Sequence, residues 1–117
     1  MKKKMKSIVN VVCEEYKISP ESLSQQKEVR WTVLEAKSVC IYFYFRFMKV
    51  ILKEIAWLFF ADPTKHDRVI YTVKQVNKEL SVNKDFTERI QRLTLILKEE
   101  GYRDFDRKKK KTVVTFE

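Results

Sequence analysis

Residues that turn a polypeptide are scarce in this sequence, and their scarcity limits the folds that it can form. The 117 residues include one glycine and two prolines, Pro20 and Pro63. Multi-stranded β folds need many turns rich in these residues, so the sequence favours an all-α fold. Hydrophobic residues make up 44% of the chain, which is enough for the core of one domain and argues against wholesale disorder.

Apolar residues recur at helical spacing along most of the chain. In the first such segment, Ile8, Val11, Val12 and Tyr16 share one helical face. The spacing and the breaks between segments predict a compact bundle of about six helices, over 5–16, 20–24, 32–48, 51–60, 64–80 and 84–100.

Several of these helices have recognisable ends. Thr32 and Glu35 have the spacing of a capping box, so Thr32 is expected to cap the third helix. Thr64 is the expected cap of the fifth, with Asp67 near its positive end. Gly101 fits the C-terminal cap of the last helix.

The helix expected over 32–48 is apolar nearly all round, which is typical of the buried centre of a bundle. Its aromatic and β-branched residues are also strand-like, but its length and capping signal favour a helix. Aromatic side chains here and nearby are expected in the core rather than on an exposed base-stacking surface: Trp31, Tyr42, Phe43, Phe45, Phe47 and Trp57.

The formal net charge of +9 lies at the two ends of the chain. The lysines among the first six residues and the basic run 107–111 account for it, so the body between them is close to neutral. An excess of basic residues favours nucleic acid or acidic lipid as a partner. Short basic tails, however, are more often solvated segments that bind nothing specifically. We therefore expect a basic tail over 1–6, one helical domain over 7–101 and a second basic tail over 102–117.

Several features favour a cytoplasmic location. Cys13 and Cys40 lie in apolar helical segments and are expected as buried thiols of a reducing compartment rather than as a disulfide. The first lysines are not followed by a signal-peptide pattern. The apolar stretch 39–60 contains four charged residues, so we expect no membrane span and no membrane partner.

No catalytic pattern is present in the sequence. One histidine and two distant cysteines give no metal-ligand spacing. A Gly-rich phosphate loop, a nucleophile elbow and a paired-carboxylate motif are also missing. We expect a protein that is not an enzyme and needs neither cofactor nor small-molecule substrate.

Two helices separated by a short break, over 51–60 and from Thr64 onward, have the pattern of a helix-turn-helix. This pattern alone is weak, because any helical bundle contains such pairs.

The order of several motifs resembles the C-terminal DNA-binding domain of the bacterial replication initiator DnaA. Residues 8–23 look like the family's opening, where "E-Y-Y-x-I" precedes a short helix ending in leucine, and 36–46 look like its long helix "A-R-Q-x-A-M-Y-L-A-R". Residues 52–56 resemble "L-P-E-I-G", 65–71 resemble the signature "D-H-T-T-V-L-H", and 84–86 resemble the closing "x-D-F". The resemblance implies a six-helix fold that is also similar to the Trp repressor, and binding of double-stranded DNA.

The resemblance implies that the helix starting near Thr64 enters the major groove with its N-terminal end. Lys65, His66 and Arg68 would donate to base edges or phosphates. Asp67 would accept from a cytosine amine or simply cap the helix.

Two further roles follow from the resemblance alone. Arg30, in the loop before the long helix, would reach the minor groove, and Lys37 would bind the DNA backbone. Both are more often ordinary solvated charges, and without the resemblance His66 is an ordinary surface residue.

The sequence departs from the family in several places. Its Asp-His-Thr-Thr is replaced by Lys65-His66-Asp67-Arg68, its Gly-Gly-Arg turn by the longer 60–64, and its very basic loop by 25–30. Because the sequence contains no Gly-rich phosphate loop, we expect it to lack the nucleotide-hydrolysing module of DnaA. We therefore expect a stand-alone divergent relative with a regulatory role in replication or transcription, such as an adaptor or an element-encoded repressor, rather than an initiator.

Two alternatives remain open. One is a protein-interaction module on the same fold with an eroded DNA surface, which the near-neutral body and the altered signature favour. The other is a structural or membrane-surface protein that uses its basic tails.

Overall fold

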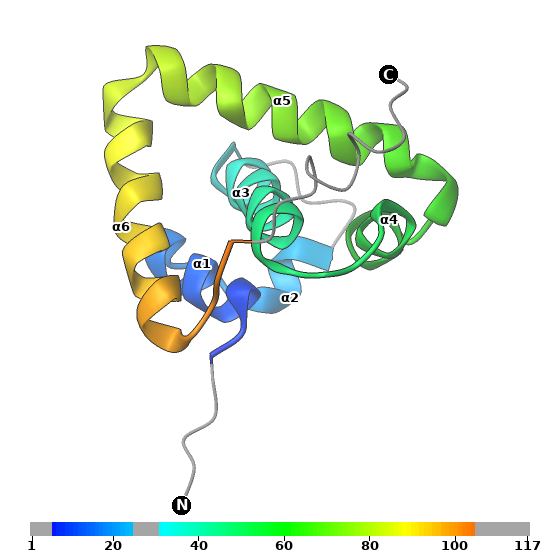
Figure 1. The fold of residues 1–117 in the computed structure, drawn as a ribbon, viewed down its shortest axis with the longest axis horizontal. Helices are drawn as coiled ribbons and strands as arrows, with labels where there is room; N and C mark the ends of the chain where they lie inside the picture. Colours follow the sequence, from blue (N-terminus) through cyan, green and yellow to red (C-terminus); the bar gives the residue numbers. More distant parts are fainter. Residues whose placement is uncertain (1–5, 25–30, 105–117) are drawn as a thin grey trace, which may run out of the picture.

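The computed structural model describes residues 6–24 and 31–104, which form helices joined by short connections (Figure 1). The elements are α1 (Ile8–Tyr16), α2 (Pro20–Ser24), α3 (Trp31–Phe47), α4 (Leu52–Phe60), the 3-10 turn η1 (Pro63–Lys65), α5 (His66–Val82) and α6 (Lys84–Glu100). No strand occurs in these two ranges. The expected all-α fold of about six helices is confirmed, and the strand alternative for the central aromatic segment is excluded.

Helix α3 is the centre of the body. It packs against α1 and α2 on one side and against α4 and α5 on the other. Figure 1 shows α5 crossing one side of the body and α6 turning down one edge to reach α1. The almost continuous apolar surface of α3 is explained by this position, because neighbours cover it from several directions.

The buried side chains form two clusters that meet at α3. In the larger one, Val39, Cys40 and Phe43 pack with residues of α1 and α6. In the smaller one, Ile41 packs with residues of α4 and α5. Phe43 and Phe47 are buried as expected, Tyr42 and Phe45 are half-buried, and both cysteines are buried free thiols.

Two expected helix caps are wrong. Thr32 is the second residue inside α3, so it does not cap that helix. Thr64 lies within η1, where the side chain of Asp62 accepts a hydrogen bond from the Thr64 backbone N–H at 3.0 Å. Asp62 followed by Pro63 is a stronger local start signal, because aspartate accepts well at a cap and proline suits the first helical position.

The last two helices are separated by a single residue rather than by the expected break over 81–83. Helix α5 continues to Val82, and Asn83 caps α6 by accepting a hydrogen bond from the Phe86 backbone N–H at 3.1 Å. Gly101 ends α6 in the left-handed conformation with φ of 116°, as expected.

Both tryptophans are exposed, so their expected core packing is wrong. The exposed fraction is 75% for Trp31 and 58% for Trp57. Trp31 is the first residue of α3, and Trp57 lies on the side of α4 away from its buried Ile55 and Ala56. A short helix packed through one face leaves the large side chains of its other face in solvent.

The packed body continues past Gly101. The ring of Tyr102 stacks on Phe47, and its hydroxyl donates a hydrogen bond to the backbone oxygen of Lys6 at 2.8 Å. Asp104 forms an ion pair with Arg46 of α3. Within the described part of the chain, every helix is too short or too polar to cross a bilayer.

Candidate nucleic-acid interface

Helices α4 and α5 are joined by a tight connection and cross each other. Ala61 ends α4 in the left-handed conformation with φ of 56°, and η1 leads directly into α5. Figure 1 shows α4 almost end-on while α5 runs across the view. Ile55 and Ala56 of α4 share the smaller buried cluster with Val69 and Val73 of α5, and this packing fixes the two helices relative to each other.

The predicted contact residues gather at the N-terminal end of α5. Thr64, Asp67 and Arg68 are exposed, whereas Lys65 and His66 are half-buried. Thr64 also donates its hydroxyl to Asp62 at 2.6 Å, which fixes the turn before the helix. Arg30 lies outside the described residues.

His66 is turned partly inward. Its Nε2 lies 3.6 Å from an Asp67 carboxylate oxygen, and its Nδ1 is buried without a hydrogen-bond partner among the described residues. The imidazole therefore presents only one edge to solvent, so Lys65 and Arg68 are the better placed donors of the three.

Lys37 and Arg68 are far apart in the sequence but meet at one aromatic ring. The Lys37 ammonium lies 5.1 Å and the Arg68 guanidinium 5.2 Å from the centroid of the Phe60 ring. Cations at this distance are attracted by the ring quadrupole. Helices α3, α4 and α5 each contribute one of the three side chains, so the tertiary fold creates this cationic pair.

The cationic pair lacks a counter-charge in the described part of the chain, where neither residue forms a salt bridge with a carboxylate. Partial burial lowers the pKa of Lys37, and the nearby charge of Arg68 lowers it further. Both effects make an anion favourable beside the pair, because it would offset the repulsion and the lost hydration.

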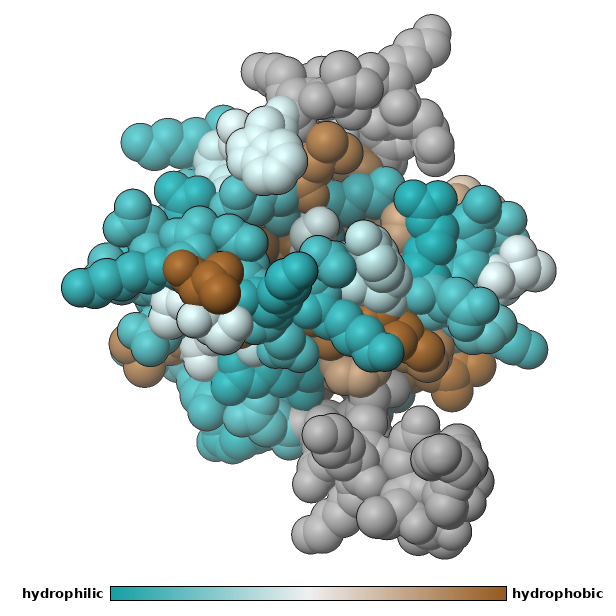
Figure 2. Space-filling model, turned by 90° about the horizontal axis from the view of Figure 1, so that it is seen from above, coloured by the Kyte–Doolittle hydropathy of each residue, from teal (hydrophilic) through white to brown (hydrophobic). Residues whose placement is uncertain are grey.

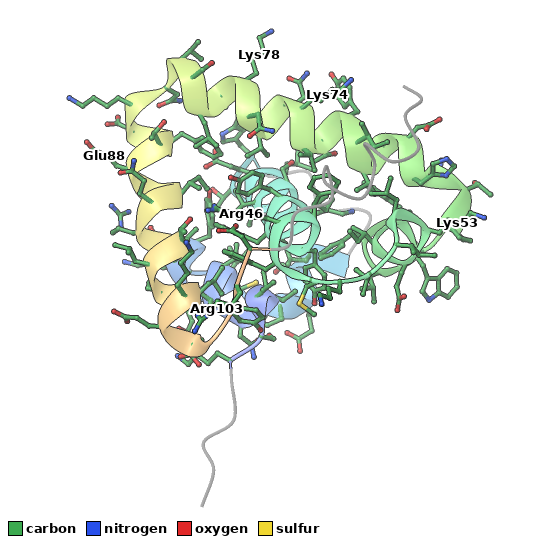
Figure 3. All side chains as sticks on the ribbon, in the orientation of Figure 1. Arg46, Lys53, Lys74, Lys78, Glu88 and Arg103 are labelled. Atoms are coloured by element: carbon green, nitrogen blue, oxygen red, sulfur yellow. The ribbon has the colours of Figure 1, made fainter. Side chains whose placement is uncertain are left out.

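The solvent side of α5 carries residues that sequence reasoning missed. Tyr71, Lys74, Gln75 and Lys78 are all exposed, and together with Arg68 we call them the outer face of α5. Figure 3 labels Lys74 and Lys78, which point away from the body. Figure 2, which looks onto this side of the molecule, shows a mainly hydrophilic surface with isolated apolar side chains. The signal was available, because these positions lie opposite the buried Val69, Val73 and Val76 on a helix.

Several cations elsewhere in the body are paired. Arg89 and Arg92 of α6 both contact Glu15 of α1, at 3.2 and 2.8 Å. Lys6 pairs with Glu14 at 3.2 Å. Lys17, Lys53 and Lys84 also form no salt bridge within the described ranges, so the distinction of α5 is that Arg68, Lys74 and Lys78 share one helix.

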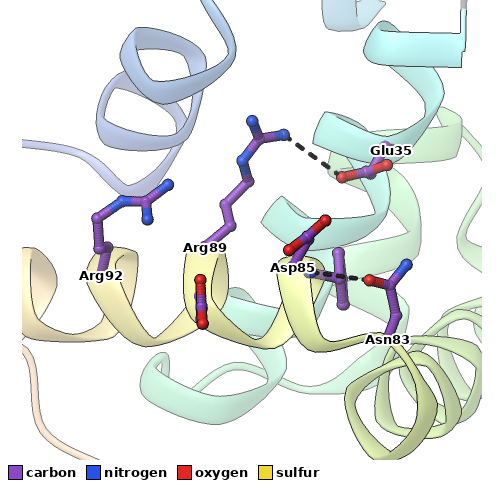
Figure 4. A pocket seen from close by; sticks show the side chains of 7 residues that line it. Glu35, Asn83, Asp85, Arg89 and Arg92 are labelled. Carbon is purple, nitrogen blue, oxygen red and sulfur yellow. Dashed lines mark hydrogen bonds and ion pairs between the residues drawn. The ribbon is translucent and has the colours of Figure 1, made fainter.

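A shallow polar pocket lies where α3 approaches the start of α6 (Figure 4). Arg89 reaches Glu35 at 3.7 Å there, and Glu35 also accepts a hydrogen bond from the Tyr16 hydroxyl at 2.6 Å. The opposite charges of Arg89 and Glu35 in this pocket therefore compensate one another. In the described ranges, no three histidine, cysteine or carboxylate side chains come together as a metal site.

Comparison with known proteins adds no relative. No protein-family model matches the chain, and no curated protein sequence is significantly similar to it.

Proposed function

We propose that this protein binds double-stranded DNA through a helix-turn-helix formed by α4 and α5. The observation that carries the proposal is the cationic pair of Lys37 and Arg68 on the Phe60 ring, beside the first turn of α5, a pair that has no carboxylate partner within residues 6–24 and 31–104. A regularly charged polymer of phosphates is the anion that such a surface at a helix start fits best. The resemblance to the DnaA domain points to the same ligand.

In this proposal, the N-terminal end of α5 enters the major groove. The positive end of the helix dipole attracts phosphate. Arg68 and Lys65 donate to guanine or to phosphate, and a good bidentate contact contributes roughly 1–3 kcal/mol of discrimination between bases. Lys37 holds the DNA backbone, and Asp67 in the first turn accepts from a cytosine amine or stabilises the helix start.

The biological role that we propose is regulation of replication or transcription without nucleotide hydrolysis. The protein would occupy a site on DNA and act by its presence there, which needs no catalytic group.

The decisive experiment separates the helix-turn-helix from the lysine tails. We define the tail-neutral chain as the full chain in which Lys2, Lys3, Lys4 and the four lysines 108–111 are replaced by glutamine. Its binding to a short mixed-sequence duplex is measured by fluorescence anisotropy at two salt concentrations. We expect binding to persist, and to weaken by roughly tenfold or more in the double variant Lys65→Ala and Arg68→Ala.

A matched control removes one charge from a remote site. Lys17→Gln alters an exposed lysine at the end of α1, and we expect it to leave the affinity unchanged. If the tail-neutral chain fails to bind, the tails alone bind DNA and the proposal is wrong.

A second candidate function is protein binding, and α4 supports it. Ile51, Trp57 and Leu58 have exposed fractions of 64%, 58% and 54%. Clustered exposed apolar side chains are typical of protein interfaces. If the tail-neutral chain binds no DNA, and a protein partner binds the parent but not Trp57→Glu, this second function replaces the first.

A further inference from the structure

The outer face of α5 extends well beyond the residues at the helix start. We propose that α5 lies lengthwise in the major groove, with Tyr71 and Lys78 at the base edges and Arg68 and Lys74 on phosphates. This inference rests on the proposed function and adds the residues that would read sequence and the orientation of the helix.

The angular order of the side chains supports this orientation. On an α-helix, Tyr71 and Lys78 lie opposite the buried stripe of valines, at the crest of the exposed side. Arg68 and Lys74 lie on opposite sides of that crest. A helix in the groove has bases before its crest and one phosphate strand on each flank, so Arg68 and Lys74 would each meet a different strand.

The length of the face also fits a groove. Arg68 and Lys78 are separated by about 15 Å along the axis, at about 1.5 Å per residue. The major groove is about 12 Å wide and accepts an α-helix. Contacts over three turns are therefore possible if the helix follows the groove, whereas a helix inserted by its tip would leave Lys74 and Lys78 in solvent.

The charges along this face are of one sign. Lys74 and Lys78 form no salt bridge within the described residues. The two acidic residues of α5 lie outside the stretch from Arg68 to Lys78. Asp67 precedes it and contacts His66, and Glu79 follows it and accepts a hydrogen bond from the Asn83 side chain at 2.7 Å.

Tyr71 is the one aromatic residue in this face. Its exposed fraction is 63%, and its hydroxyl makes no hydrogen bond among the described residues. An aromatic ring at the crest can contact a thymine methyl group, and its hydroxyl can donate to a base acceptor. The hydroxyl and the ring thus give Tyr71 two ways to discriminate between bases.

The first test measures the salt dependence of binding. The tail-neutral chain and its Arg68→Gln and Lys74→Gln variants are titrated with the mixed-sequence duplex over about 50 to 200 mM salt. Each phosphate contact contributes about 0.9 to the slope of log affinity against log salt, so we expect each variant to lose about that amount. Lys17→Gln removes the same charge away from α5 and should keep the parent slope.

The second test concerns Tyr71. The tail-neutral chain and its Tyr71→Ala and Tyr71→Phe variants are used to select sequences from a random duplex pool. We expect Tyr71→Ala to lose base preference at one position. Tyr71→Phe keeps the ring and lacks the hydroxyl, so we expect it to keep the part of that base preference that the ring contributes. Circular dichroism of each variant checks that the helices remain intact.

The outcomes separate this inference from the proposed function. If Arg68→Gln lowers the slope while Lys74→Gln behaves like Lys17→Gln, only the start of α5 meets DNA, and the lengthwise orientation is wrong. If Tyr71→Ala selects the same DNA sequences as the tail-neutral chain, the proposed contact between Tyr71 and the bases is wrong. Loss of all binding by the tail-neutral chain overturns the proposed function, and this inference with it.

Discussion

The Tyr102 hydroxyl donates a hydrogen bond to the backbone oxygen of Lys6 at 2.8 Å, so residues from the two ends of the described chain are in direct contact. The backbone N–H of Lys6 in turn donates to the side chain of Glu100 at 3.0 Å. The start of α1 and the end of α6 are therefore held by each other.

Removing the Tyr102 hydroxyl should destabilise the fold without changing its core. Tyr102→Phe keeps the ring on Phe47 and deletes only the hydrogen bond, so we expect a loss of about 1 kcal/mol in the free energy of unfolding. Urea denaturation followed by circular dichroism measures it. Tyr71→Phe is the matched control, because its exposed hydroxyl has no partner in the described ranges. Equal stability of the two variants would contradict the prediction.

The ion pair between Arg46 and Asp104 should make stability depend on acid pH. The Arg46 guanidinium holds the pKa of Asp104 below its usual value, with Lys98 helping at 3.4 Å. A carboxyl whose pKa is depressed by folding stabilises the fold above its unfolded pKa, and this contribution is lost as the pH falls through the folded pKa.

We therefore expect Asp104→Asn to be less stable than the parent at neutral pH. The difference should be about 0.5 kcal/mol, because the pair is partly exposed to solvent. It should shrink as the pH falls below about 4, the ordinary aspartate pKa. Urea denaturation at several pH values measures it, and a difference that grows in acid would exclude this mechanism.

The Asn83 cap should stabilise the junction of α5 and α6. Its side chain accepts from the Phe86 backbone N–H, and alanine would leave that donor without its cap. We expect Asn83→Ala to lower the free energy of unfolding by about 1 kcal/mol. Asn77→Ala is the control within α5, where alanine has the higher helix propensity and no loss is expected. Thermal unfolding compares the two, and an unaffected Asn83→Ala would show that the cap contributes little.

The end of α4 should gain stability from glycine. Ala61 has a positive φ of 56°, which costs a residue with a side chain roughly 1–2 kcal/mol. Because glycine loses more entropy on folding, we expect a net gain of about 0.5–1 kcal/mol from Ala61→Gly. Ala56→Gly, at a buried position inside α4, should instead destabilise the protein. Differential scanning calorimetry distinguishes the two signs.

Helical periodicity predicted most of the fold. The faces of α1 and α6 follow directly from apolar spacing, and Phe86, Ile90, Leu93 and Leu97 are all buried. The caps were less predictable, since several polar residues near a helix start compete for the role. Asp62 prevailed over Thr64 because it precedes a proline that suits the first helical turn.

The candidate site depended more on tertiary structure. Lys65 and Arg68 lie together because they are neighbours in sequence. The meeting of Lys37 and Arg68 on Phe60 depends on how three helices pack, and no local pattern encodes it. The exposure of Trp31 and Trp57 was missed for the same reason, because residue size favours burial only where a neighbouring helix provides cover.

Helix α5 contributes to the body mainly through Val69, Val73 and Val76, with Leu80 packed partly against the larger cluster. Its opposite side is therefore a set of positions at which evolution or design can change residues with little effect on folding, since exposed substitutions usually alter stability by no more than about 0.5 kcal/mol. The same fold can gain a different binding preference when a few of these exposed side chains are exchanged and the core stays unchanged. Substitutions should therefore be tolerated better on this exposed side than among the valines beneath it.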